Sequence, residues 1–327
     1  MSFSSITSFP NGVSSFGVPM LGGVNGIPFT GNYFFVDPVN GADGNTGSAD
    51  SPLATLTAAY NGCVSGNNDV VFIIGNGSIT GTVTISSAFT WAKDATHLVG
   101  ITAPTGVAQR ARIAVPTTGA AFANMFTVTA SGCYFANFST FDGFATGTTS
   151  QICWTDSGQR NCYDNVQFGG MGDAASAQDA GSRSLKLGGS ESTFNRCTVG
   201  LDTVTRTVAN ASLELLSGAT RNAFYDCVFP FQTSASTPLG IIVSAVAGID
   251  RWTLFDRCKF INNVASTSTT MAGLATLPAS AGGLLLMKDC TLVGITEYGT
   301  DATTRGQIYI DGGTVTAATT GIAVNPI

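Results

Sequence analysis

Charged residues are scarce in this sequence. Only 10% of its 327 residues are charged, whereas an ordinary soluble domain has about 25%. Lys and Arg together number 14 and Asp and Glu 20, which gives a net charge of −6, and Lys and Arg form no run anywhere. Binding to nucleic acid requires basic patches, so no nucleic-acid partner is expected.

Long apolar runs, secretion signals and metal motifs are also missing. No apolar stretch reaches the roughly 20 residues that cross a bilayer, so no membrane partner is expected. The start of the chain has neither the basic residues nor the apolar core of a secretion signal, so we expect synthesis in a cytosol with the eight cysteines reduced. There is no Cys-x-x-Cys pair and no phosphate-binding Gly-x-x-x-x-Gly-Lys element. The sequence therefore predicts no metal and no cofactor.

A single histidine limits the hydrolytic chemistry that the chain can perform. His97 would have to serve any Ser-His-Asp triad, and no Gly-x-Ser-x-Gly nucleophile turn is present. His97 directly precedes two apolar residues, Leu98 and Val99. A structural role is therefore expected for it.

A repeat of about thirty residues dominates the rest of the sequence. It contains a large apolar residue, two mostly polar residues and then a buried-type residue, which falls at positions 138, 166, 197, 227, 258 and 290. The gaps between these positions are 28, 31, 30, 31 and 32 residues. Segments that alternate apolar and polar residues precede them, as strands with one buried face do. The sequence therefore predicts an all-β solenoid in which each repeat forms one rung.

Equivalent residues of successive rungs stack into columns, about 4.8 Å apart. One column contains four successive cysteines, and the column three residues earlier is largely aromatic. We expect both columns inside the coil, with the cysteines as small apolar fillers. Disulfides along the column are the less favoured alternative, because residues in register rarely direct their Cβ atoms suitably. The predicted core ladder comprises Phe194, Cys197, Phe224, Cys227, Phe255, Cys258 and Cys290.

The position before each cysteine alternates in charge from rung to rung. Arg196, Asp226, Arg257 and Asp289 occupy it in order. On the surface they would form a charge ladder in which each side chain lies between opposite charges, and each pair would contribute about 0.2–1 kcal/mol. Four independent surface charges are the alternative.

Glycan hydrolysis is the main catalytic alternative, and it requires two carboxyl groups within about 5–10 Å of each other. Adjacent rungs could supply Asp226 with Asp256 or Asp289, or Asp164 with Asp156. The aspartates at 226 and 289 fit the charge ladder or a turn equally well, and glutamate occurs only three times in the chain. We therefore expect no catalytic residues and a protein that is not an enzyme.

Residues 1–31 differ from the repeats, because they mix aromatic and apolar residues with Gly, Pro and Ser without a helical or strand period. A floppy terminus is one interpretation. An extended arm that becomes ordered against a partner is favoured, because a floppy tail would not usually carry so many large apolar residues. The candidate docking residues are Phe3, Phe9, Pro10, Phe16, Pro19, Met20, Leu21 and Phe29.

The segment after the arm predicts a strand, a turn-rich loop and one short helix. The strand includes Phe35-Val36-Asp37-Pro38. The apolar residues between Leu53 and Tyr60 fit one face of a helix. Ser51 is the expected N-cap of this helix and Pro52 its first residue.

This segment also carries a family resemblance. Phe35-Val36-Asp37-Pro38, Asn40-Gly41-Ala42-Asp43 and Ser51-Pro52-Leu53-Ala54-Thr55-Leu56 together resemble the entry of pectin-lyase-like right-handed parallel β-helices. Such entries are common in phage tailspikes and other virion proteins. The resemblance implies one right-handed parallel β-helix domain over residues 32–327, with a short N-terminal capping helix after the extended arm.

The resemblance and the missing secretion signal together lead to a functional expectation. We expect a structural protein of a phage virion, a homotrimer that decorates the capsid or forms a head spike. Residues 1–31 would attach it to the major capsid protein or another virion protein, on the virion surface, after assembly in the host cytoplasm. The alternative is a phage tailspike or tail fibre that binds or depolymerises a host surface glycan. A secreted adhesin is a third, less favoured, interpretation.

Overall fold

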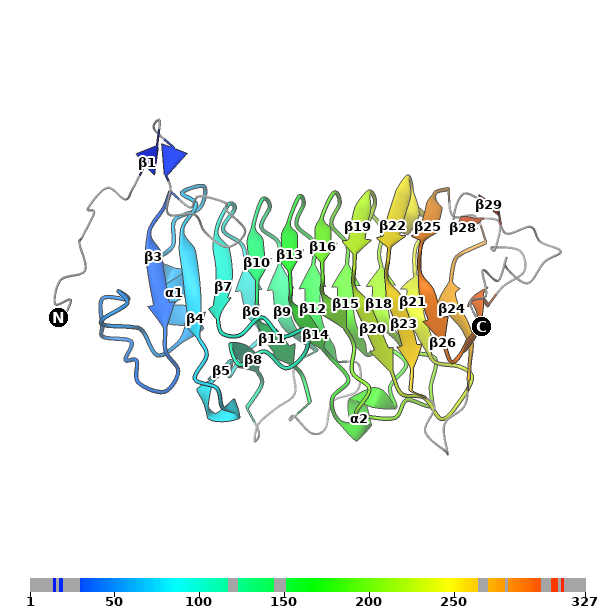
Figure 1. Cartoon of the computed structure of the whole chain (residues 1–327), viewed down its shortest axis with the longest axis horizontal. Coiled ribbons are helices and arrows are strands. Elements are labelled where there is room, and N and C mark those ends of the chain that lie inside the picture. The colour runs from blue at the N-terminus through cyan, green and yellow to red at the C-terminus, as the bar shows by residue number, and fades with distance from the viewer. Residues whose placement is uncertain are drawn as a thin grey trace.

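The computed structural model describes residues 14–15, 18–19, 30–116, 123–143, 151–263, 270–279, 282–300, 307–310 and 313–314. These residues form an all-β coil whose rungs stack along the long axis of the molecule (Figure 1). Each rung passes through three parallel sheets in turn, here named A, B and C. The prediction of a right-handed parallel β-helix is confirmed.

Sheet A contains the aromatic column. Its strands are β3 (Tyr33–Val36), β4 (Val70–Ile74), β7 (His97–Ile101), β10 (Tyr134–Ala136), β13 (Cys162–Asp164), β16 (Thr193–Asn195), β19 (Asn222–Tyr225), β22 (Trp252–Asp256), β25 (Leu284–Lys288), β28 (Ile308–Ile310) and β29 (Gly313–Thr314). All neighbours in this sheet are parallel except β28 and β29, which pair antiparallel.

Sheets B and C complete each rung. Sheet B consists of β5 (Thr82–Thr84), β8 (Arg112–Ala114), β11 (Ser139–Phe141), β14 (Gln167–Gly169), β17 (Thr198–Val199), β20 (Val228–Phe231), β23 (Lys259–Asn262) and β26 (Thr291–Val293). Sheet C consists of β6 (Phe89–Trp91), β9 (Asn124–Val128), β12 (Ile152–Asp156), β15 (Arg183–Leu187), β18 (Ala211–Leu215), β21 (Leu239–Val243), β24 (Met271–Thr276) and β27 (Ile295–Gly299). A separate two-stranded hairpin pairs β1 (Ser14–Ser15) with β2 (Val18–Pro19).

The core lies between the three sheets and is filled by stacked side chains. In sheet A the rings of Phe135, Tyr163, Phe194, Phe224 and Phe255 stack with successive centroid distances of 4.9, 4.6, 4.4 and 4.8 Å. These distances match the spacing of adjacent strands, which is about 4.8 Å. Every ring in this column is fully buried, so the rung repeat of the sequence is also the repeat of the core.

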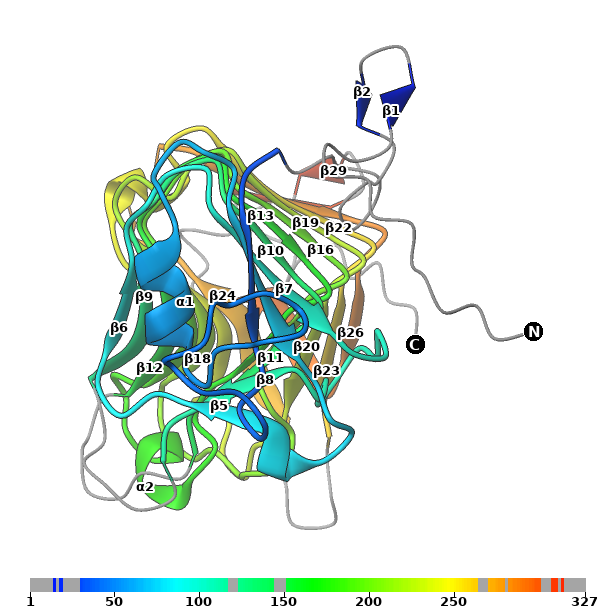
Figure 2. The same cartoon turned by 90° about the vertical axis from the view of Figure 1, so that its left-hand side faces the viewer.

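The N-terminal end of the coil is covered by α1 (Leu56–Gly62), which Figure 2 shows in a view turned by 90° from that of Figure 1. The prediction that the helix starts at Ser51 and Pro52 is wrong, because Ser51 forms a bridge with Ser48 and the helix begins at Leu56. Thr55 caps the helix, and its hydroxyl accepts a hydrogen bond from the backbone nitrogen of Ala58. A second short helix that the sequence did not predict, α2 (Ala174–Ala177), lies between sheets B and C.

The three corners of the coil differ in length and chemistry. From β10 onward the chain turns between sheets A and B over a short corner, whereas the B–C corner of the middle rungs carries long loops, including α2 and residues 200–210. The 3₁₀ helix η2 (Ile79–Gly81) precedes β5, and η3 (Val246–Ile249) lies in a C–A corner. Among the described residues no helix is both long and apolar enough to cross a bilayer.

Candidate functional site

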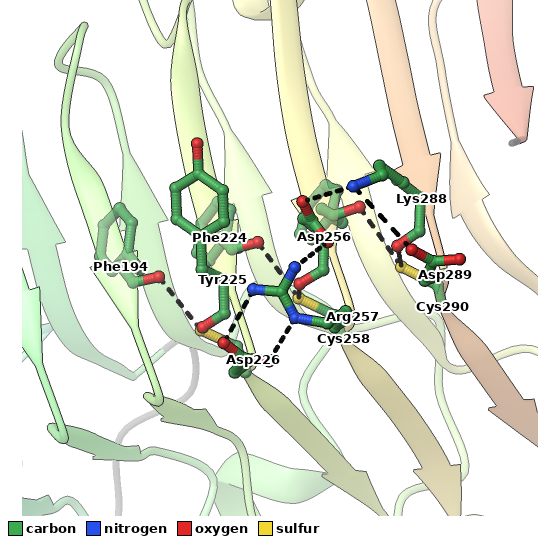
Figure 3. A network of polar contacts seen from close by, with 12 residues as sticks. Phe194, Phe224, Tyr225, Asp226, Asp256, Arg257, Cys258, Lys288, Asp289 and Cys290 are labelled. Atoms are coloured by element: carbon green, nitrogen blue, oxygen red, sulfur yellow. Dashed lines mark hydrogen bonds and ion pairs between the residues drawn. The ribbon is translucent and has the colours of Figure 1, made fainter. Parts of the chain in front are cut away.

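From β13 onward, the A–B corner is built on one left-handed residue in each rung. Asn165, Arg196, Asp226, Arg257 and Asp289 have φ between 50° and 53°. This conformation is uncommon for residues other than glycine and is tolerated best by Asn and Asp. The predicted charge ladder therefore occupies the tightest turn of the coil, and its side chains point out of it (Figure 3).

The ion pairs at this corner connect ladder residues with the ends of the neighbouring strands. Arg257 binds Asp226 of the preceding rung through two hydrogen bonds of 2.8 and 3.0 Å, and it also binds Asp256 at 2.8 Å (Figure 3). Arg196 forms its ion pair with Asp164, at 2.6 Å. The pair that the structure records for Asp289 is with Lys288, at 3.9 Å.

The core ladder residues lie inside the coil. Phe194, Phe224, Phe255 and the first three cysteines are fully buried, and Cys290 is 9% exposed. Each of the last three thiols donates to a carbonyl one rung earlier, as Cys258 does to the oxygen of Phe224 at 3.4 Å (Figure 3). Burial raises the pKa of the Cys227 thiol well above its ordinary value. All four are free thiols that serve as core residues.

The carboxylates considered for glycan hydrolysis are engaged in structural contacts. Asp156 faces the interior, where it accepts hydrogen bonds from the hydroxyl of Tyr163 at 2.9 Å and the backbone nitrogen of Gly158 at 2.8 Å. Burial raises the pKa of Asp156 to about 6. Asp164 accepts from Arg196, and Asp256 contacts Arg257 and Lys288.

Two further predictions concern His97 and the candidate docking residues of the arm. His97 is 6% exposed, its Nδ1 accepts a hydrogen bond from the backbone nitrogen of Tyr134 at 3.0 Å, and burial lowers its pKa to about 4. It is therefore neutral at pH 7. Of the eight candidate docking residues, only the backbone of Pro19 in β2 falls within the described residues. Phe3, Phe9, Pro10, Phe16, Met20, Leu21 and Phe29 lie outside them.

A second group of polar residues, which the sequence did not suggest, lies at the B–C corner and on the adjoining outer face of sheet C. Arg183 begins β15, and its Nε donates to Glu214 of β18 at 2.9 Å. Its Nη1 donates to the carbonyl oxygens of Ala180 and Ser182, both at 2.7 Å. Lys186 contacts the same carboxylate of Glu214 at 3.6 Å. Two cations therefore share one buried carboxylate.

Arg206 adds a third cation to this group. It is 2% exposed, and its Nη1 donates to Asn210 Oδ1 at 3.2 Å and to the carbonyl oxygen of Leu239 at 3.4 Å. Within the described part of the chain, its Nε and Nη2 have no hydrogen-bond partner and no carboxylate pairs with it. Burial, and secondarily the charge of Arg183, lowers the pKa of Arg206 to about 9, so it stays positive at pH 7. As far as the structure describes this corner, it thus holds a buried charge with no carboxylate to compensate it.

Asp142 is a buried carboxylate at the same edge of the coil. It follows β11, and its backbone is held by hydrogen bonds with Gly169 at 2.9 Å and Gly172 at 3.0 Å. It is 1% exposed, and in the described structure neither carboxylate oxygen has a hydrogen-bond partner. Burial, with a smaller contribution from the charge of Asp173, raises the pKa of Asp142 to about 7. Perturbed, unpaired groups of this kind are concentrated at functional sites.

The sequence contained only a partial signal for these residues. Lys186 and Glu214 are 28 residues apart and lie side by side in the register of β15 and β18. A search for opposite charges one rung apart in sheet C would have found them. Arg206 and Asp142 lie in loops outside the repeat, and no sequence pattern marked them.

Comparison with known proteins identifies the fold. No protein-family model matches the chain, and no curated protein matches it significantly. Among solved structures it is similar to a pectin methylesterase in complex with a hexasaccharide, with 15% identity, a TM-score of 0.52, and 86% of this chain and 90% of that chain covered. The pectate lyase Pel9A gives a TM-score of 0.54 at 15% identity, covering 80% of this chain and 63% of that chain. The chain therefore has the pectin-lyase-like β-helix fold.

These comparisons correct one prediction. The sequence led us to expect a protein that is not an enzyme, because its candidate aspartates fit structural roles equally well and glutamate is scarce. That expectation is wrong, because the fold of this chain is one that enzymes use: the similar structures are a pectin methylesterase and a pectate lyase. The β-helix of this chain is an enzyme-associated fold, and polar groups outside its repeats become candidates for a functional site.

Proposed function

We propose that this protein binds and depolymerises an anionic polysaccharide, and that the B–C corner holds the anionic groups of the chain. The observation that carries the proposal is Arg206, a buried cation whose Nε and Nη2 have no hydrogen-bond partner among the described residues. A sugar carboxylate would bind Nε and Nη2 at once, in the bidentate geometry that makes arginine a preferred carboxylate ligand. Arg183 and Lys186 contact Glu214, and the charge of Asp179 also acts on Arg183, so the positive charge that the proposal uses is that of Arg206.

Access to Arg206 requires movement of the corner. The guanidinium is 2% exposed, and the backbone of Arg206 is tied to the next rung through Gln232 and Ser234. A sugar carboxylate reaches it only when the loop 201–210 opens from that rung. Binding is therefore expected to be slower than binding to an open groove.

Asp142 is the candidate proton-transfer group. Its pKa of about 7 lies where a carboxyl can both give and take a proton at neutral pH. Protonated, it can donate to the leaving oxygen of a glycosidic bond, while a water molecule adds to the anomeric carbon and releases a proton to the solvent. The similarity to structures of a pectin methylesterase and a pectate lyase supports a polysaccharide substrate but does not assign one.

The proposal is tested by incubating the protein with polygalacturonate, anionic bacterial capsule and neutral galactan. We expect binding and released oligosaccharides, measured by calorimetry and mass spectrometry, only with the anionic polymers. Arg206→Gln should weaken binding, whereas Asp142→Asn should retain binding and lose cleavage. Arg251→Gln, at an exposed cation beside Asp250, is the matched control. Binding to galactan alone, or to no polymer at all, would refute the proposed function.

The finer identity remains part of the proposal. A phage tailspike or tail fibre acting on a host surface glycan would combine a polysaccharide substrate with the resemblance of the entry segment to virion proteins. The homotrimer, the virion-surface location and attachment through residues 1–31 stay predictions. Deleting residues 1–31 should leave the B–C corner active but abolish attachment to particles, and retained attachment would contradict the arm hypothesis.

A further inference from the structure

Asn210 connects Arg206 with α2. It lies directly before β18, in the B–C corner, and is fully buried. Its Nδ2 donates to the carbonyl oxygens of Ala177 and Asp179, at 2.8 and 3.3 Å. Its Oδ1 accepts from Nη1 of Arg206 at 3.2 Å. Ala177 is the last residue of α2, which Figure 1 shows at the lower edge of the coil, so one amide side chain holds both the end of this helix and the guanidinium.

The contacts of Asn210 decide which way its amide group faces. A helix leaves its last carbonyl oxygens without a partner inside the helix. Carbonyl oxygens only accept hydrogen bonds, so the two beside Asn210 require the NH₂ group of the amide. The amide oxygen is then left for the guanidinium. The opposite orientation would place the oxygen against two carbonyl groups and the NH₂ group against a cation, so the orientation that serves Arg206 is the stable one.

One nitrogen of the Arg206 guanidinium is held, and one edge is not. Besides Asn210, Nη1 reaches the carbonyl oxygen of Leu239 at 3.4 Å, and the ring of Phe231 lies 5.1 Å from the guanidinium carbon. Nε and Nη2 have no hydrogen-bond partner among the described residues. These two nitrogens form the edge of the guanidinium that does not include Nη1.

The same edge of two other arginines binds a carboxylate in this protein. Nε and Nη2 of Arg257 donate to Asp226 at 2.8 and 3.0 Å (Figure 3). Nε of Arg196 donates to Asp164 at 3.1 Å, and its Nη2 donates to the same carboxylate at 2.6 and 2.8 Å. The described residues supply no such carboxylate to Arg206. A carboxylate from a ligand would complete the arrangement that the other two arginines already have.

A neutral side chain at position 210 leaves the charge of Arg206 available to a ligand. Asn210 accepts from the guanidinium without a charge of its own. The charge that acts on Arg206 comes from Arg183, another cation, and does not compensate it. Asn210→Asp would instead neutralise the guanidinium. One buried positive charge matches one singly charged sugar acid, because a doubly charged group would leave a buried charge unbalanced.

We propose that Asn210 is the positioning residue of the carboxylate site: it holds Nη1 of Arg206 without neutralising it, so that Nε and Nη2 together bind the single carboxylate of one uronic acid unit. This inference rests on the proposed function, because it names the acidic sugar of the same polymer. It adds the requirement that the guanidinium is held in one orientation before the sugar arrives, which lowers the cost of binding.

Calorimetry with trigalacturonate tests the role of the neutral side chain. Asn210→Asp should weaken binding about tenfold or more, because its carboxylate takes the place of the sugar acid as the partner of the charge. Asn210→Ala keeps the charge of Arg206 but releases Nη1, so we expect a loss of about threefold. The control is Ser236→Asp, which adds the same charge at an exposed position of the same corner in the next rung. Its affinity should stay within about twofold of the wild type.

Nitrogen NMR of the arginine side chains tests the positioning without a ligand. In the wild-type protein Nη1 and Nη2 of Arg206 should give two separate signals, which are assigned by their loss in Arg206→Gln. Rotation about the Nε–Cζ bond exchanges these two nitrogens, so the signals should merge in Asn210→Ala. Separate signals in Asn210→Ala would show that Asn210 does not hold the guanidinium, and the inference would be overturned.

The outcomes of the binding experiment distinguish this inference from the proposed function. Wild-type affinity for trigalacturonate in Asn210→Asp, or an equal loss in Ser236→Asp, would overturn the inference and leave the proposed function intact. If Asn210→Asp does not fold, wild-type affinity in Asn210→Ala overturns the inference in its place. If the wild-type protein binds neither trigalacturonate nor any anionic polymer, the proposed function fails and the assignment of a uronic acid fails with it.

Discussion

Replacing Arg206 by methionine should make this protein more stable and less functional. The side chain is 2% exposed and carries a charge that no carboxylate balances in the described residues. Methionine is unbranched and fills much of the same volume without a charge. The substitution therefore removes the desolvation cost of the guanidinium while keeping the loop packed against Phe231, whose ring lies 5.1 Å from the guanidinium carbon.

The size of the effect follows from the pKa. Burial lowers the pKa of Arg206 from 12.5 to about 9, a change that corresponds to about 5 kcal/mol against the charged form. Hydrogen bonds to Asn210 and Leu239 are lost on substitution, and bonds of a charged group contribute about 1.5–3 kcal/mol each. Both are long, at 3.2 and 3.4 Å, so they offset the cost only in part. We expect a net gain of about 1–4 kcal/mol, the range in which replacing buried charges by apolar residues is stabilising.

Thermal unfolding measures this gain. At about 2–4 °C per kcal/mol, the Tm should rise by several degrees. Arg251→Met, at a side chain that is 67% exposed, should change the stability by no more than about 0.5 kcal/mol. An anionic polysaccharide should raise the Tm of the wild-type protein by mass action and leave that of Arg206→Met unchanged. An equal or lower Tm for Arg206→Met without ligand would show that the charge is compensated in solution, and the argument for an anion site would fall.

Three other substitutions test separate parts of the structure. Because the pKa of Asp142 is raised from 3.8 to about 7, the stability of the folded state should fall as the pH rises from about 4 to 7. In Asp142→Asn the contribution of this carboxyl to the fall should disappear. Parallel Tm profiles of the two proteins between pH 4 and 8 would contradict this. Phe224→Ala in the aromatic column should cost about 3–5 kcal/mol in urea unfolding, and a cost below 1 kcal/mol would rule out tight stacking. Asp226→Arg removes the partner of Arg257 and should lower the Tm slightly at low salt and not at high salt, whereas an unchanged Tm at low salt would mean four independent charges.

The regular part of the fold was accessible from the sequence because its constraint is periodic. Phe194, Phe224 and Phe255 recur at intervals of 30 and 31 residues, and a side chain that stacks on its own equivalent must recur in this way. The N-cap of α1 was placed wrongly at Ser51 for a local reason. The carboxylate of Asp43, twelve residues before Thr55, accepts hydrogen bonds from the backbone nitrogens of Ala54 and Thr55 and from the Thr55 hydroxyl. No local sequence pattern shows so distant a contact.

The candidate site was inaccessible because it lies where the period breaks. Asp142 and Arg206 belong to loops of the B–C corner, whose lengths and residues differ from rung to rung. They are candidates because their charged groups are buried and the described residues give those groups too few hydrogen-bond partners. This property arises from the packing of the loops, and no sequence motif shows it. Lys186 and Glu214 are the exception, since they obey the rung register and could have been paired from it.

Asp142 and Arg206, for which the described residues supply no partner, also do not neutralise each other. Asp142 and Arg206 lie at the same edge of the coil, and their rungs are separated by one intervening rung, about 10 Å along the axis at the strand spacing. Burial nevertheless raises the pKa of the acid and lowers that of the base, so neither charge compensates the other. Asp142 can become neutral by taking up a proton near pH 7, but Arg206 cannot lose one there. The two groups therefore require different partners: Asp142 requires a proton and Arg206 an anion. In the proposed complex an anionic glycan serves both, because its anionic group binds Arg206 and its leaving oxygen accepts the proton of Asp142.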